Sequence, residues 1–156
     1  MNDMASAFKK AGYKTPSTSP PKEEGKKVIK FYTDPEKKKL DSELITNKAE
    51  EWVNKFVRRQ KDDLTSAQIR RFYGEVLSLE EKINEVEDFD VMLPYVKLLK
   101  SKAAYAANPG NRKIPDAFKD FIFQMVDSIK DKKDFKAFKT IFEAVVGYFY
   151  GKEGVK

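Results

Sequence analysis

Apolar side chains recur at alternating steps of three and four residues along most of this chain, and this spacing predicts helices. Over residues 66–87 the pattern runs through Ile69, Phe72, Val76, Leu79, Ile83 and Val86. One face of an α-helix carries side chains at this spacing, whereas a half-buried strand alternates every second residue. Comparable patterns cover residues 41–61, 90–107, 115–129 and 135–149. We therefore predict an all-α protein, a compact bundle of about five helices.

The segment 64–73 carries three agreeing signals for the start of a helix. Thr65 is a preferred N-cap residue, and Gln68, three positions later, completes a capping box. Leu64 and Ile69 occupy the two positions of a hydrophobic staple. Other helix starts or caps are predicted at Asp34 with Pro35, Asp90, Pro115 with Asp116, and Asp134.

Three parts are predicted along the chain: a flexible basic tail over residues 1–39, a helical bundle domain over 40–150 and a C-terminal tail over 151–156. The first 40 residues hold ten lysines against five acidic residues, and residues 15–21 are of low complexity. Such a segment buries too little apolar surface to offset the entropy lost on ordering. Residues 28–32 are a short apolar run, which we expect to pack as an extended strap across the bundle.

The composition excludes several kinds of chemistry. The chain has no cysteine and no histidine, so it lacks thiol nucleophiles, disulfides and the commonest general base and metal ligand. It also lacks a glycine-rich phosphate loop. Asp88 and Asp90 are two carboxylates that in principle hold magnesium, but such a site needs further oxygen ligands, and Asp90 equally suits a helix cap. We expect no enzyme, no cofactor and no metal.

No apolar run is long enough to span a membrane, and residues 1–10 lack the apolar core of a secretory signal. A cytoplasmic protein is the expectation. Its acidic and basic residues are separated along the sequence: residues 80–90 hold six acidic residues and one lysine, whereas 97–113 hold five cations and no acid. Solvated helix faces would explain each block taken singly. Together the blocks favour one surface for phosphate and another for a basic partner.

Binding of RNA is the function that the cations favour. Arg58 and Arg59 precede a short connection and Arg70 and Arg71 follow it, so the two pairs are expected to lie near one another. The start of a helix adds free N–H groups and a partial positive charge. The candidate RNA-binding residues are Lys55, Arg58, Arg59, Arg70, Arg71, Lys97, Lys100, Lys102, Arg112 and Lys113. Tyrosines among them are candidates for stacking on bases, namely Tyr73, Tyr95 and Tyr105.

Three segments, in this order, resemble the small subunit of type III-A CRISPR effector (Csm) complexes. They are LTSAQIRRFY at 64–73, LLKSKAAYAA at 98–107 and IFEAVVGY at 141–148. The second signature usually continues into an arginine directly after the alanines, whereas this chain has residues 108–111 before Arg112. Whether Arg112 takes the place of that arginine is left open by the sequence.

The resemblance implies a non-catalytic, all-helical RNA-binding subunit, present in several copies along a ribonucleoprotein filament. It would line the groove where guide and target RNA pair and touch the RNA backbone without reading sequence. The partners implied are guide and target RNA, the backbone and large subunits, and neighbouring copies of the same chain, with no membrane. The alternative is a helical adaptor that binds only proteins, through the acidic residues 80–90 and the alanine-rich helix around residues 103–107.

Overall fold

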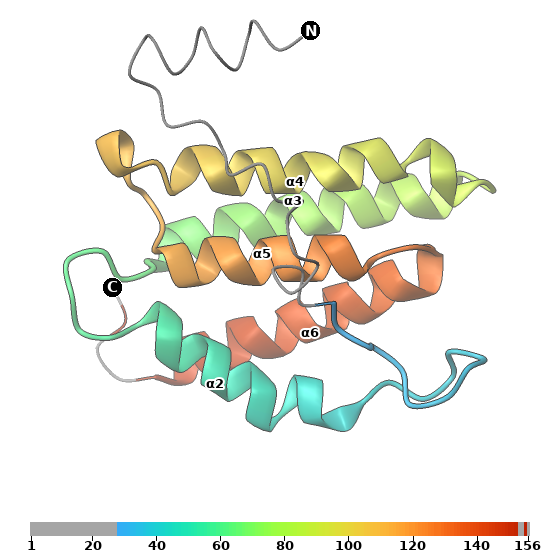
Figure 1. The fold of residues 1–156 in the computed structure, drawn as a ribbon, viewed down its shortest axis with the longest axis horizontal. Coiled ribbons are helices and arrows are strands. Elements are labelled where there is room, and N and C mark those ends of the chain that lie inside the picture. The colour runs from blue at the N-terminus through green and yellow to red at the C-terminus, as the bar shows by residue number, and fades with distance from the viewer. Residues whose placement is uncertain (1–27, 153–154, 156) are drawn as a thin grey trace, which may run out of the picture.

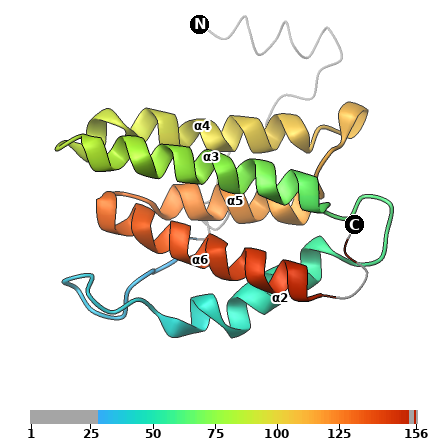
Figure 2. The same cartoon turned by 180° about the vertical axis from the view of Figure 1, so that it is seen from behind.

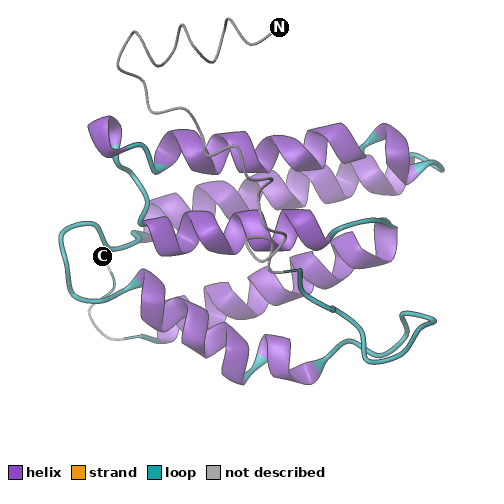
Figure 3. Ribbon diagram, viewed as in Figure 1, coloured by secondary structure: helices purple, strands orange, loops and turns teal. Residues whose placement is uncertain are grey.

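The structure, a computed structural model, describes residues 28–152 and 155, and over this part of the chain the regular elements are helices (Figure 3). They are η2 (Ser42–Ile45), α2 (Asn47–Phe56), α3 (Ser66–Glu85), η3 (Phe89–Val91), α4 (Leu93–Ala106), η4 (Pro109–Asn111), α5 (Asp116–Ser128) and α6 (Lys132–Gly151). The prediction of an all-α bundle is confirmed. Of the tail predicted over residues 1–39, residues 1–27 lie outside the described residues.

The five α-helices of the described residues pack side by side. α4 packs against α5 and α3 against α6, while α2 lies across α5 and α6. Figures 1 and 2 show α3 and α4 on one side of the α5 and α6 pair, with α2 on the other. Because successive helices reverse direction, the connections 57–65 and 107–115 lie at the same end of the bundle as the end of α6 (Figure 1).

An aromatic cluster joins four of the helices at the centre of the core. Phe118 of α5 is fully buried, and its ring contacts Phe56 of α2 and Phe72 of α3, each at 5.2 Å between centroids. Phe142 of α6 lies 6.1 Å away in an edge-to-face arrangement. Edge-to-face pairs stabilise a core beyond the area that they bury. Phe118 thus ties together the helices on both sides of α5.

The strap predicted over residues 28–32 is confirmed. Phe31 is buried, and the N–H of Ile29 donates to the Ser128 hydroxyl at the end of α5, at 2.7 Å. The chain then makes a tight turn instead of the helix predicted at Asp34 with Pro35. The Asp34 carboxylate accepts from the N–H groups of Lys38 and Lys39, at 3.0 and 2.7 Å. That prediction was wrong because these two amides close a local turn, which a helix would not allow.

Three other helix boundaries differ from the predictions. The helix expected over 41–61 is a 3₁₀ turn, η2, followed by α2, which ends at Phe56. Asp88, rather than Asp90, caps η3, and α4 begins only at Leu93, with Pro94 in its first turn. Asp131, rather than Asp134, caps α6 by accepting the Asp134 N–H at 2.8 Å. Two carboxylates spaced three apart both suit the cap, and periodicity does not separate them.

Candidate nucleic-acid interface

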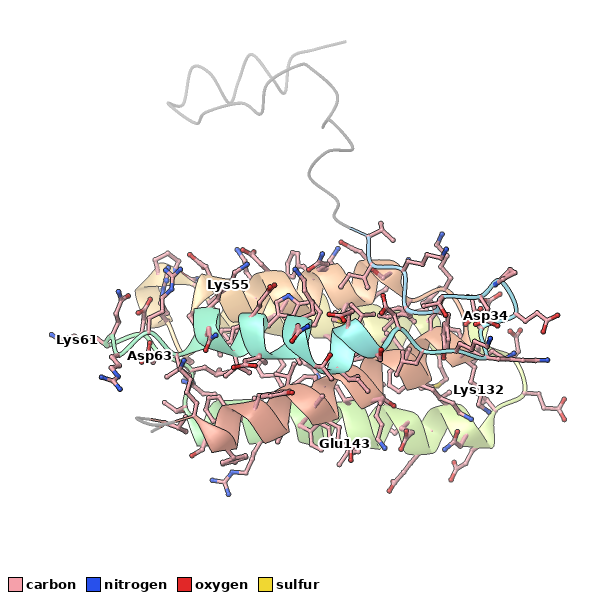
Figure 4. All side chains as sticks on the ribbon, turned by 90° about the horizontal axis from the view of Figure 1, so that it is seen from below. Asp34, Lys55, Lys61, Asp63, Lys132 and Glu143 are labelled. Atoms are coloured by element: carbon pink, nitrogen blue, oxygen red, sulfur yellow. The ribbon has the colours of Figure 1, made fainter. Side chains whose placement is uncertain are left out.

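Most of the predicted RNA-binding cations lie at one end of the bundle. α2, α4 and α6 end there, and α3 and α5 begin there (Figure 1). Figure 4 shows Lys61 and Asp63 at this end, and Asp34 and Lys132 at the opposite one. We call the first the basic end. The opposite end includes an acidic corner between α3 and α4, made by Glu85, Glu87, Asp88 and Asp90.

A buried carboxylate fixes the connection from α2 to α3. Asp63 accepts hydrogen bonds from the N–H of Arg58 at 2.8 Å and from the N–H of Gln60 at 3.1 Å, and it is 7% exposed. Arg59, between these donors, has a φ of 59°, a left-handed conformation that few residues other than glycine adopt. The exposed side chains of Arg58 and Arg59 border a hollow of about 350 Å³ together with Lys152. The loop thus holds two arginines outward on a fixed backbone.

The start of α3 is built as the sequence predicts. The Gln68 N–H donates to the Thr65 hydroxyl at 3.4 Å, and the Thr65 N–H donates to the Gln68 amide oxygen at 3.0 Å, which completes the capping box. The two arginines that follow point in different directions, since adjacent helical residues are about 100° apart. Arg70 Nε donates to the Ser66 carbonyl of its own first turn at 3.3 Å, whereas Arg71 faces α4.

A groove of about 560 Å³ runs between the start of α3 and the end of α4, and we call it the α3–α4 groove. Three of the predicted cations border it from three elements: Arg71 from α3, Lys102 from α4, and Lys113 from the connection after η4. Lys102 forms an ion pair with Glu75, so this carboxylate in the groove is neutralised. The remaining lining residues are Thr65, Ala67, Gln68, Phe72, Ser101, Tyr105, Ala106 and Ile114.

Besides Arg58, Arg59 and Arg70, four more of the predicted residues lie outside this groove. Lys100 points to α5, where it pairs with Asp127 at 2.6 Å and lies 4.9 Å from the centre of the Phe123 ring. Lys55 borders a separate cleft between α2 and α5, and Lys97 is exposed on α4. Arg112 is held between two acids, Asp62 at 3.6 Å and Asp116 at 3.5 Å. The lysines of α4 therefore do not form one surface, because Lys100 and Lys102 reach toward different neighbouring helices.

The three tyrosines differ in their surroundings. Tyr73 packs against Phe142 with 5.4 Å between ring centroids, and burial, followed by the nearby Glu143 carboxylate, raises the pKa of its hydroxyl. Tyr95 and Tyr105 of α4 are 55% and 69% exposed. Only the latter two are accessible to a base. Sequence reasoning also missed Lys152, since only the fold brings the end of α6 beside Arg58.

Nothing in the described part of the chain groups three or more acidic side chains as a metal site would need. No helix among the described residues has the length and hydropathy to cross a membrane. Comparisons with curated proteins and with solved structures give no match. The family model described as Csm2 Type III-A matches residues 39–153, which include all three signature segments. The chain therefore belongs to the Csm2 family, the small subunits of type III-A CRISPR effector (Csm) complexes.

Proposed function

We propose that this subunit holds RNA by its sugar–phosphate chain at the basic end, without reading sequence. The observation that supports this most is that five predicted cations lie toward the same end of the bundle, on two surfaces. Arg58 and Arg59 stand on the loop fixed by Asp63, and Arg71, Lys102 and Lys113 border the α3–α4 groove. Phosphate contacts of this kind supply affinity and position but carry no base identity.

The first turn of α3 adds to this field. The partial positive charge of this helix start lies beside Arg71, where an anion is favoured. Arginine also offers two parallel N–H donors to one phosphate, which lysine does not. The RNA in the effector complex would be the guide and the target strands, with catalysis left to other subunits. The acidic corner of one copy complements the basic end of the next, so copies would line up between backbone and large subunits.

Neutralising four cations tests this proposal. The variant Arg58→Gln, Arg59→Gln, Arg71→Gln, Lys113→Gln is expected to bind single-stranded RNA more weakly. The slope of log affinity against log salt should flatten by about 0.7 for each phosphate contact that is lost. Fluorescence anisotropy over a salt series measures both quantities, and circular dichroism checks that helicity is kept.

A control variant removes the same charge elsewhere. Lys38→Gln, Lys39→Gln, Lys130→Gln and Lys136→Gln are all exposed positions away from the groove. This variant should keep the wild-type salt slope, because phosphate contacts are local. Equal losses in the two variants would show that only net charge matters, and unchanged binding in the first would remove the basic end as the RNA site.

A second candidate function, a protein adaptor, is favoured by a different observation. A further groove of about 560 Å³ lies between α3 and α4 toward the acidic corner, and apolar and charged side chains both line it. Exposed Val91, Tyr95 and Leu98 border it on the α4 side, at helical spacing. Exposed apolar faces of this kind mark contacts with protein. Nuclease treatment separates the two functions: partners retained on the chain after RNA is digested, and lost with Leu98→Asp, are bound directly.

A further inference from the structure

The α3–α4 groove is large enough to hold more than a phosphate group. α3 packs on α6 and α4 packs on α5, so the two helices open a space between them. Its floor is apolar, with Phe72 and Ile114 nearly fully buried, and small side chains at Ala67 and Ser101 leave the walls open. Its volume of about 560 Å³ is within the range of small-ligand sites.

Tyr105 lies at this groove, one position before the end of α4. At 69% it is the most exposed large apolar side chain of the described residues. Its phenol ring has no place in the core, unlike that of Tyr73, which packs on Phe142. An aromatic face left in water beside cations is what single-stranded nucleic acids stack on, because every base offers a flat ring.

Three cations line the same groove as this ring. Arg71 comes from α3 and Lys102 from α4, two elements that meet only through the fold. The position of Lys113 is fixed by its own N–H, which donates to the Ala106 carbonyl at 2.7 Å, next to Tyr105. Lys102 and Glu75 form an ion pair and cancel each other's charge, so Arg71 and Lys113 carry the net positive charge of the groove. An apolar floor, one exposed ring and a cationic border together match one nucleotide: a base with its phosphate.

We propose that the α3–α4 groove holds one unpaired nucleotide of an RNA strand, with the base stacked on Tyr105 and the adjoining phosphate held by Arg71 and Lys113. This inference rests on the proposed function, because it adds a preference for single-stranded RNA to the RNA binding proposed for the basic end. Both faces of a base inside a duplex are covered by its neighbours, so the site selects a single strand. It does not select a sequence, because stacking tolerates all bases.

The test uses the full chain and two labelled RNA probes, a single-stranded 15-mer of uridines and the same strand with abasic ribose at its central positions. Tyr105→Ala is expected to weaken binding of the intact strand about tenfold, as loss of one stacked base does. It should leave binding of the abasic strand and the salt slope unchanged. Tyr105→Phe, which keeps the ring, should bind like wild type. Tyr150→Ala, at an exposed tyrosine of α6, is the matched control.

The outcomes separate this inference from the proposed function. If wild type binds RNA with a salt slope but Tyr105→Ala binds equally well, the nucleotide site is overturned and the basic end stands. If wild type binds the intact strand and the abasic strand with equal affinity, the nucleotide site is likewise overturned. If wild type binds neither strand at low salt, both proposals fail. Loss of a protein partner by Tyr105→Ala, with RNA binding intact, would reassign the groove to a protein contact.

Discussion

Asp63 shows how a single buried carboxylate sets the position of two arginines. It accepts the N–H groups of Arg58 and Gln60, and Arg59 between them takes a positive φ as the backbone wraps around it. The capping pair Thr65 and Gln68 then begins α3 at the next residues. One polar side chain therefore links the end of α2 to the start of the helix that carries Arg71.

Asp63→Ala is expected to lower the free energy of unfolding by about 1–3 kcal/mol, because two N–H groups of a part-buried loop lose their acceptor. Urea unfolding measures the loss. RNA affinity should fall as well, since Arg58 and Arg59 lose their fixed backbone. Asp62→Ala is the control, because Asp62 is exposed and its ion pair with Arg112 spans 3.6 Å. It should cost less than about 1 kcal/mol. Equal effects of the two substitutions would contradict the role of Asp63.

Among single residues, interactions between neighbours in the sequence could be predicted from it, whereas interactions between residues far apart in the sequence could not. The capping box of Thr65 and Gln68 involves residues three apart, so the sequence alone predicts it. Lys152 and Arg58 lie far apart in the sequence and meet only in the fold, so no local pattern marks such a pair. Asp131 and Asp134 show a third case: both suit a cap, and Asp134 is instead buried beneath Lys37.

Among the elements, the strap and its turn are held to the start of α6 by charge. Lys37, in a left-handed conformation, pairs with Asp131 at 2.5 Å and Asp134 at 3.0 Å. Burial opposes the charge of Lys37, but the hydrogen bonds to Asp131 and Asp134 outweigh it and raise the Lys37 pKa above 10.5. Burial likewise works against the Asp131 charge, and Lys37 with the Asp134 N–H still lowers the Asp131 pKa below 3.8.

Because of these pKa shifts, the stability that the strap adds to the fold depends on pH. The Asp131 contribution is complete above its ordinary pKa and is lost as pH falls through the lowered value. The Lys37 contribution is complete below its ordinary pKa and is lost as pH rises through the raised value. Lys37→Met should therefore cost about 1 kcal/mol near neutral pH, a surface-pair magnitude, and less in strong acid. Urea unfolding at the two pH values measures the difference.

Lys38→Met is the control for this substitution, since the Lys38 side chain is 72% exposed and its ion pair within the described residues is with the exposed Glu36. It should change stability little at either pH. A loss for Lys37→Met that is the same in acid as at neutral pH would show that the side chain acts through packing of its methylenes, and not through the two carboxylates.

Over the whole molecule, the aromatic cluster around Phe118 ties α2, α3 and α6 to α5, so the basic end is only as fixed as that core. The helical pattern predicted which phenylalanines are buried, but not that α3 and α4 would each pack on a different helix and leave a groove. Which helices become neighbours depends on how well the shapes of their packing faces fit. The spacing of apolar residues along a single helix does not reveal this.

Phe118→Ala is expected to lower the free energy of unfolding by about 3–5 kcal/mol, the usual cost of a large cavity in a core. Thermal and urea unfolding measure it, and RNA binding should weaken in proportion to the unfolded fraction. Phe123→Ala, on the part-exposed face of α5 beneath Lys100, should cost clearly less. Similar costs at the two positions would mean that the cluster is not the centre of the core.

The acidic corner and the basic end lie at opposite ends of the helices, so charge is distributed unevenly along the long axis of the bundle. If the basic end holds RNA as we propose, a polyanion would attract this end first, and Glu85, Glu87, Asp88 and Asp90 would face away from it. Encounters then begin in one orientation, which raises the association rate at low ionic strength more than it slows dissociation. A subunit that arrived in this way would leave its acidic corner facing away from the strand.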